Sequence, residues 1–253
     1  MRKKAPQGTS PELEMKIHGL NACRALFKAR SSALIRLYVT QKTMQQLADI
    51  VRHCVDFRLA YHVVSEEELS ELSGATHHEG VMMIIRRRKN PSESELKEVA
   101  QGKGLFLALE QVENPHNLGA IVRSAAHFGV KAIFLVGKKT SWQNGAFYRT
   151  AEGGAEEVLI AAVENWPKML ELKTKLGLSL YTTSGHKGVS LYQQKLPEKL
   201  LVALGAEGQG LSDVALSLGE KRLLIPGTGA VESLNVGVAS AVIMGEWSRQ
   251  HGP

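Results

Sequence analysis

The stretch LFLALEQVENPHNLGAIVRSAAHFGVKAIFLV, residues 105–136, indicates the fold class of this chain. It begins with an apolar run at 105–109 and ends with another at 132–136, and neither run alternates polar with apolar residues. Such runs are typical of strands that are buried on both faces. Four apolar residues between them recur at helical spacing: Leu118, Ile121, Val122 and Ala125. Asn117 is placed to cap this helix and Gly129 to end it, so the stretch predicts a strand, a helix and a second strand.

The same pattern continues toward the end of the chain. Three further apolar runs lack alternation: 178–182, 200–204 and 222–225. An amphipathic helix is predicted at 166–176, with Pro167 in its first turn, where proline is well tolerated. Strands that alternate with helices over residues 104–253 predict an α/β domain with a mostly parallel sheet and helices on both faces.

A smaller α/β domain is predicted before it, at residues 16–86. Three runs in this region are strand-like: 34–39, 61–64 and 81–85. The stretch at 20–29 places Leu20, Cys23 and Phe27 on one face of a predicted helix.

Two segments flank this smaller domain. Residues 1–15 are basic and are predicted to be a flexible tail; no apolar segment follows them, so we expect no secretory signal. Residues 87–103 contain charged residues, a proline and a late glycine without apolar periodicity, which predicts a linker.

The composition is that of a folded globular protein, with 43% hydrophobic and 22% charged residues. The formal net charge of +6 favours a polyanionic partner. No apolar run approaches the ~20 residues of a membrane span, so we expect no membrane partner. Cys23 and Cys54 form neither a metal pattern nor a disulfide framework, which favours the cytoplasm. His77 and His78 lack the further ligands of a zinc site, and we expect no metal.

Candidate chemistry lies in three loops that follow predicted strands. In parallel sheets, ligands bind beyond the carboxyl ends of the strands. The loops are EQVENPHNLGAIVRSAAHFG (110–129), GAEGQGLS (205–212) and IPGTGAVESLNVGVASA (225–241). The glycines at 205–210 do not follow the G-x-G-x-x-G order and occur late in the domain, which argues against a dinucleotide-binding enzyme.

Taken together, the three loops resemble the motifs of the SpoU (TrmH-type) RNA 2′-O-ribose methyltransferases of the SPOUT superfamily. The resemblance covers roughly residues 104–249. Residues 17–85 resemble the RNA-binding domain that precedes the catalytic domain in many members. The combination of NPHNLG, RTAEGGAEEV and GEW is most similar to the YfiF-type branch.

The resemblance implies a trefoil knot that binds S-adenosylmethionine largely through backbone groups. By the family's pattern, Gly205, Ile225 and Leu234 supply these contacts. Four neighbouring residues complete the expected cofactor site: Thr183, Ala206, Gly208 and Pro226.

The resemblance also implies roles in methyl transfer to a ribose hydroxyl of tRNA or rRNA. Arg123 is expected to grip the adjacent phosphate and stabilise the incipient alkoxide, because a guanidinium is a poor base but a good bidentate donor. Asn117 is expected both to cap its helix and to orient Arg123 or the ribose, and Glu207 to bond Arg123 or backbone amides. Ser233 and Asn235 are expected to line the reaction side of the pocket.

The resemblance further implies a homodimer through the first-motif helix and the last helix. The apolar run at 236–244 is expected to be buried. The chain departs from the family's pattern at Asn114, at Gly227 and in the element AEGGA at 151–155. Two other functions therefore stay open: a catalytically silent RNA-binding protein on this scaffold, and a methyltransferase that modifies a base.

Overall fold

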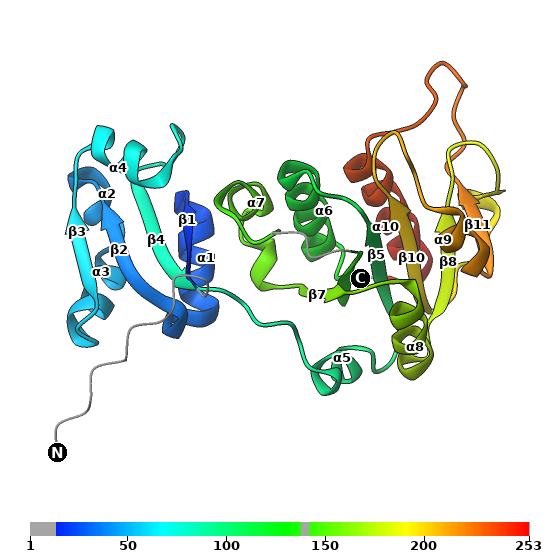
Figure 1. Ribbon diagram of the computed structural model, residues 1–253, viewed down its shortest axis with the longest axis horizontal. Helices are drawn as coiled ribbons and strands as arrows, with labels where there is room; N and C mark the ends of the chain where they lie inside the picture. Colours follow the sequence, from blue (N-terminus) through cyan, green and yellow to red (C-terminus); the bar gives the residue numbers. More distant parts are fainter. Residues whose placement is uncertain (1–13, 138–141, 253) are drawn as a thin grey trace. The chain divides into compact units, whose positions relative to one another are not determined.

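The computed structural model describes residues 14–137 and 142–252, which form two compact units (Figure 1). The first unit comprises Met1–Lys89 with Gln143–Arg149, and the second comprises Asn90–Trp142 with Thr150–Pro253. The predicted tail lies outside the described residues except for its last two, which begin strand β1. No helix in the described part of the chain is long and apolar enough to cross a membrane.

The first unit contains a four-stranded sheet in the order β1-β4-β2-β3. Strand β4 pairs antiparallel with β1 and β2, whereas β2 and β3 are parallel. Its elements are β1 (Glu14–His18), α1 (Leu20–Arg30), η2 (Ser31–Ala33), β2 (Leu34–Val39), α2 (Gln41–Met44), α3 (Ala48–Asp56), β3 (Ala60–Val63), α4 (Glu66–Ser73) and β4 (Val81–Arg86). Helix α1 buries Ala22, Cys23 and Leu26, so of the predicted helical face only Cys23 is fully buried.

The second unit contains a seven-stranded sheet in the order β7-β6-β5-β10-β8-β11-β9. Every pair of neighbouring strands in it is parallel, which confirms the predicted fold class. The strands are β5 (Gly104–Glu110), β6 (Ala132–Val136), β7 (Leu159–Val163), β8 (Ser179–Thr183), β9 (Val189–Ser190), β10 (Lys199–Gly205) and β11 (Lys221–Leu224). The helices are α5 (Glu93–Val99), α6 (Pro115–His127), η3 (Gly154–Glu156), α8 (Trp166–Leu176), η4 (Leu191–Gln193), α9 (Asp213–Leu218) and α10 (Val236–His251); α7 (Gly145–Ala151) spans a unit boundary.

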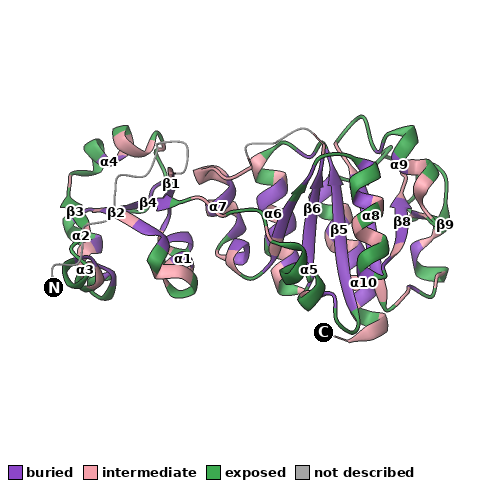
Figure 2. Cartoon of the chain, turned by 60° about the horizontal axis from the view of Figure 1, so that its bottom comes forward, coloured by how far each residue is buried: buried purple, intermediate pink, exposed green. Residues whose placement is uncertain are grey.

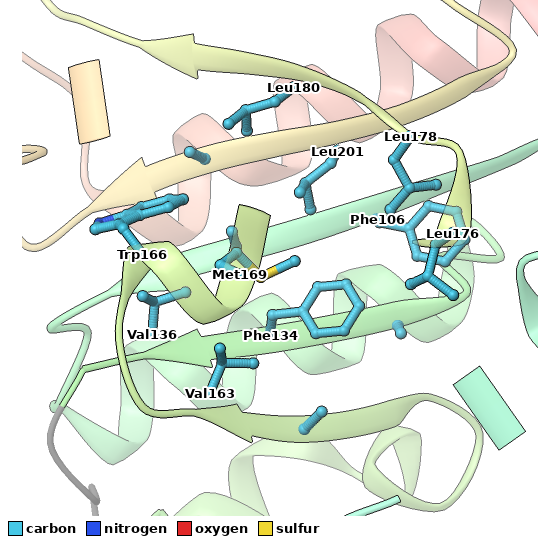
Figure 3. Packing of buried hydrophobic residues seen from close by; sticks show 14 of the residues in the cluster. Phe106, Phe134, Val136, Val163, Trp166, Met169, Leu176, Leu178, Leu180 and Leu201 are labelled. Carbon is cyan, nitrogen blue, oxygen red and sulfur yellow. The ribbon is translucent and has the colours of Figure 1, made fainter. Parts of the chain in front are cut away.

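The core of the second unit lies on both faces of this sheet. Every residue of β5 and β6 is buried, so helices cover the sheet on each side (Figure 2). On one face, the Phe106 and Phe134 rings stack with centroids 6.5 Å apart, and Trp166 and Met169 of α8 pack over this cluster (Figure 3). Both faces of the sheet are therefore closely packed, and a ligand can bind only at its edges or at the ends of its strands.

The predicted linker differs from the structure. It contains α5, whose Leu96 belongs to the core cluster together with the following Ala100. Ser92 and Glu95 form a capping box that begins this helix. Only one apolar side chain of α5 is fully buried, which explains why the segment shows no periodicity.

Candidate active site at the carboxyl ends of the central strands

Three polar side chains from distant parts of the chain meet where β5, β10 and β11 end. The Asn117 amide nitrogen donates to Glu207 Oε2 at 2.8 Å. The Asn235 amide nitrogen donates to Asn117 Oδ1 at 3.1 Å and also to Glu207 Oε1. Both oxygens of Glu207 therefore accept hydrogen bonds from asparagine amides, and the three predicted motifs are joined at one place.

Asn235 also begins the last helix. Its Oδ1 accepts hydrogen bonds from the backbone nitrogens of Gly237 at 2.9 Å and Val238 at 3.2 Å. One side chain thus satisfies two of the unpaired donors at the start of α10 while its nitrogen holds the cluster. These two roles explain why a polar residue directly precedes the apolar run at 236–244.

Helix α6 is not capped by Asn117, as the sequence pattern predicts, but by Asn114. Asn114 Oδ1 accepts from the backbone nitrogens of His116 at 2.9 Å and Asn117 at 3.4 Å, and Pro115 occupies the first turn. An asparagine–proline pair begins the helix as an aspartate–proline pair would, so the departure at Asn114 leaves the helix start intact. Because Asn114 takes the capping position, the side chain of Asn117 is available to Glu207.

Arg123 lies on α6, further from the helix start than Asn117. Its side chain is exposed and makes no hydrogen bond or ion pair with the residues that the structure describes. The backbone beneath it is tightly packed, because Gly154 of η3 lies against it. A Cβ atom at Gly154 would be 3.0 Å from the Val122 carbonyl oxygen and 3.2 Å from Arg123 Cα. The contact between α6 and η3 therefore fixes the backbone of Arg123, whereas its exposed guanidinium can bind an external anion.

The predicted cofactor residues lie in loops at this same end of the sheet. The β10 loop folds back on itself, since a Cβ at Gly205 would lie 2.0 Å from the Gly210 carbonyl, and Ala206 forms an isolated bridge with Gly210. Gly208 has a positive φ of 78° at the exposed tip of the loop, a conformation that favours glycine. Only a residue without a side chain fits at Gly205, so backbone groups line this turn.

The loops after β8 and β11 are also brought together. Thr183 Oγ1 donates to the Ala203 carbonyl at 2.9 Å, which ties β8 to β10. A Cβ at Gly185 would lie 3.2 Å from the Glu232 carbonyl oxygen and 3.5 Å from the Ser233 Cβ. In the loop after β11, Ile225 is half-buried, whereas the remaining predicted residues of that loop are exposed: Pro226, Ser233 and Leu234. Leu234 is a large apolar side chain that is 44% exposed.

One carboxylate that the sequence pattern does not single out stabilises this region. Glu110, the last residue of β5, is buried, and its Oε1 accepts from Trp166 Nε1 at 2.7 Å and Ser212 Oγ at 2.8 Å. Its Oε2 accepts from the Ser212 backbone nitrogen at 2.8 Å. Ser212 in turn caps α9. Glu110 therefore fixes the end of the β10 loop, and the available signal was a single acidic residue at the end of a fully apolar strand.

The arrangement is suited to binding and orienting an anionic substrate. In the described ranges, no group of three His, Cys, Asp or Glu side chains is placed to hold a metal ion. The reactive features are instead one exposed guanidinium, a hydrogen-bonded carboxylate with two carboxamides, and loops that present backbone groups.

Comparisons with known proteins agree with this arrangement. Residues 104–245 match the SpoU rRNA methylase family, and residues 16–91 match the substrate-binding domain of RNA 2′-O ribose methyltransferases. The chain is 40% identical, over 94% of its own length and 69% of the other, to a protein of Escherichia coli O157:H7 named as the uncharacterized tRNA/rRNA methyltransferase YfiF. It is 31% identical, over 92% and 96%, to the 23S rRNA (guanosine-2′-O-)-methyltransferase RlmB of Shewanella oneidensis.

Solved structures show the same fold. An AdoMet-bound rRNA methyltransferase from Sinorhizobium meliloti superposes with a TM-score of 0.81 at 21% identity, covering 96% of this chain and 89% of that one. A structure described as an RNA 2′-O ribose methyltransferase gives a TM-score of 0.74 at 25% identity, over 94% and 89%. The chain therefore belongs to the SpoU rRNA methylase family.

Proposed function

We propose that this protein transfers a methyl group from S-adenosylmethionine to a ribose 2′-hydroxyl of tRNA or rRNA. The observation that carries the proposal is the Asn117–Glu207–Asn235 cluster at the strand ends, because Asn117 belongs to α6, the helix that also presents Arg123. The names of the relatives, which include tRNA/rRNA and 23S rRNA methyltransferases, support the substrate class.

The loops at 183–185, 205–210 and 225–235 are the proposed cofactor site. When bound, S-adenosylmethionine supplies an electrophilic methyl group on a sulfonium. Gly205, Ala206 and Gly208 present backbone donors and acceptors to it, and Ile225, Pro226 and Leu234 supply apolar contacts. Thr183 holds β8 in register with β10 beside this site. The turn at Gly205 excludes any side chain, which fits a cofactor that is recognised by backbone groups.

Arg123 has the proposed role of binding the phosphate next to the reactive ribose and stabilising the developing 2′-alkoxide. A guanidinium makes two parallel hydrogen bonds to a phosphate and does not lose its own proton at neutral pH. Asn117, Asn235 and Ser233 are proposed to orient the ribose, and Glu207 to hold both asparagines in the required rotamers. Positioning of this kind contributes about 7–11 kcal/mol to a bimolecular reaction in ideal cases.

A homodimer through α6 and α10 is the proposed assembly. These two helices pack against each other, yet the prediction that the run at 236–244 is buried is only partly right. Val238 is 50% exposed, and Ala241 and Val242 are half-buried. A partly exposed apolar strip on the surface of a helix is typical of a protein–protein interface. Light scattering at micromolar concentration should give twice the monomer mass of 27.6 kDa, and a monomer would contradict the proposed assembly.

Both cysteines are free and buried, which agrees with the reducing cytoplasm that we propose as the location.

Calorimetric titration with S-adenosylmethionine, followed by a methyl-transfer assay on bulk tRNA and rRNA, tests the proposal. We expect binding, and we expect 2′-O-methylated nucleosides in the enzymatic digest. A protein that binds RNA but not the cofactor would be a catalytically silent binder, and a digest that contains a methylated base would place the reaction on the base. Leu234→Arg is the matched negative control, because its side chain would fill the proposed pocket.

A further inference from the structure

The sheet of the first unit has one buried face and one partly uncovered face. On β2, Leu37 and Val39 are 0% exposed, whereas Arg36 is exposed and Tyr38 is half-buried. The register pairs Arg36 with Ala60 and Tyr38 with His62 of β3. Ala60 and His62 are both exposed, and since paired residues share a face, the surface beside Tyr38 is open to solvent at β3, whereas Met82 of β4, which pairs with Tyr38, is buried.

Two aromatic rings on this surface are stacked. The rings of Tyr38 and His62 have centroids 5.0 Å apart and an interplanar angle of 18°. Arg36 Nη1 donates to the Tyr38 hydroxyl at 3.2 Å, which fixes the outer end of the tyrosine. β3 is the edge strand of the sheet (Figure 1), so among residues 14–137 and 142–252 no further strand pairs beyond His62. One face of the imidazole stacks on Tyr38, and His62 is exposed to solvent.

Three basic residues belong to this face of the sheet. Arg36, Lys16 and Arg86 point to it by the alternation of their strands, and β2 and β3 contain no carboxylate. Negative charge lies further along the sheet: Glu14 is on β1, at the opposite edge, and α4, whose Leu72 carbonyl accepts from Lys16 Nζ at 2.6 Å, carries Glu66, Glu67, Glu68 and Glu71. Stacked aromatic rings beside guanidinium groups are the features with which proteins bind unpaired nucleotides.

We propose that Arg36, Tyr38 and His62 form a binding site for single-stranded RNA, in which one unpaired base stacks on His62 and Arg36 contacts a phosphate. The inference rests on the proposed function in that RNA is the substrate, and it adds that this unit recognises an unpaired segment. A duplex offers no free base face, so the site discriminates against it. Because stacking accepts any base, the site adds affinity and not sequence specificity.

The test measures binding of a fluorescein-labelled oligoadenylate to the full chain by anisotropy at about 50 mM salt. His62→Ala and Tyr38→Ala should each weaken binding about 5- to 100-fold, the scale of losing one base–aromatic stack. Binding of a blunt RNA duplex should change less than threefold, roughly the effect of a peripheral contact. His62→Phe should keep the affinity for the oligonucleotide, because it preserves the ring.

Tyr61→Ala is the matched control. Tyr61 lies on the same strand and is 41% exposed, but the register places it with Leu37 on the opposite face. Equal losses for Tyr61→Ala and His62→Ala, or unchanged affinity in both His62→Ala and Tyr38→Ala, would overturn the proposal. Ultraviolet crosslinking of the unaltered protein to the same oligonucleotide gives an independent measurement: the crosslinked peptides should contain residues 36–38 or 60–63, and crosslinks elsewhere alone would contradict it.

The outcome of these RNA-binding tests can be distinguished from the outcome of the tests of the proposed methyl transfer. Cofactor binding and methyl transfer test the second unit, whereas the anisotropy and crosslinking tests do not depend on catalysis. A silent protein that nevertheless binds the oligonucleotide through His62 would refute the proposed activity and leave this inference standing.

Discussion

The two sheets of this protein differ in how many of their faces are buried. In the second unit, every residue of β5 and β6 is buried, and the Asn117–Glu207–Asn235 cluster lies where the strands end. In the first unit, β3 is exposed at all four positions and β2 exposes Arg36. The sheet of the second unit is therefore accessible to a ligand at its strand ends, whereas the sheet of the first unit is accessible on one face.

This difference follows from the strand pairing. Parallel strands joined by helices receive a helix on each side, which leaves the carboxyl ends as the place for a ligand. A small, mostly antiparallel sheet is stable with one face solvated, and its edge strand can use both backbone and side chains for binding. The first arrangement suits a site that must hold reacting groups in fixed positions, and the second suits a surface that accepts a variable partner.

The largest expected effect concerns the strand-end site. Arg123→Ala should lower methyl transfer by at least ~10²-fold, the usual scale for losing one preorganised charge-stabilising group. The affinity for S-adenosylmethionine should stay within a few-fold of the wild type, because the proposed cofactor loops do not include α6. Single-turnover kinetics and calorimetry measure the two quantities separately.

Arg123→Lys is the control for charge alone and should restore little activity, because an ammonium group cannot form the bidentate contact with a phosphate. A variant Arg123→Ala that loses the cofactor but keeps full turnover at saturating cofactor would show that Arg123 is a binding residue.

The contact between η3 and α6 gives the next prediction. Gly154→Ala places a methyl group against the Arg123 backbone, and α6 must shift by a few tenths of an ångström. Turnover should fall about tenfold, since small displacements at a reacting centre are costly. Gly245→Ala is the matched control, because its Cβ would meet Phe128 at an ordinary 3.7 Å. That variant should keep its activity and gain up to about 1 kcal/mol in the free energy of unfolding from helix propensity. Equal turnover in the two variants would contradict the positioning role of Gly154.

Helix caps in the two units allow a comparison of stability. The Ser65 side chain bonds only within its own helix start, where it accepts from the Glu68 backbone nitrogen at 3.1 Å and bonds the Glu67 carboxylate, whereas Asn235 caps α10 and also donates to the distant Asn117 and Glu207. Ser65→Ala should cost about 1 kcal/mol in the free energy of unfolding, and Asn235→Ala about 2 kcal/mol or more. Urea unfolding followed by circular dichroism measures both, and a larger loss for Ser65→Ala would contradict the importance of the cluster.

The smallest expected effect is a pH dependence at the surface of the second unit. Lys175 and Lys97, whose nitrogens lie 2.6 Å and 2.8 Å from the Glu93 carboxylate, lower the pKa of Glu93 from 4.5 to about 2. A lowered pKa in the folded state stabilises the protein above the unfolded-state value, and this contribution disappears as the pH falls toward about 2. Glu93→Gln should therefore lower the melting temperature slightly at neutral pH and have no effect near pH 2. A difference that persists in acid would exclude the ion pair as its cause.

Local patterns in the sequence predicted most of the second unit. The runs at 105–109, 132–136 and 200–204 lie within strands, and 166–176 is the helix as predicted. Strand β7, of sequence LIAAV, was missed because two of its five residues are alanines, which carry little strand preference. Strand β1 was missed because its sequence, EMKIH, mixes charged and apolar residues beside the basic start of the chain.

The site was predictable only in part. The three motifs bring Asn117, Glu207 and Asn235 to attention one by one, but the hydrogen bonds among them join positions that are far apart in the sequence. The same is true of Glu110, whose partners lie on α8 and at the start of α9. A polar residue reveals its own chemistry in the sequence, whereas its partner is set by the tertiary fold. The catalytic roles remain predictions for the variants above.

The bond between Asn235 and Asn117 has a consequence for the order in which the protein folds. It joins residues 118 positions apart, and α10 packs on α6 from the same distance along the chain. Contacts of such long sequence separation form late, because the intervening chain must first become compact. The sheet can be complete while the site is still open, since α10 contributes no strand. A chain that has not yet docked α10 thus has its core but no assembled Asn117–Glu207–Asn235 cluster, so formation of this cluster reports that α10 has docked.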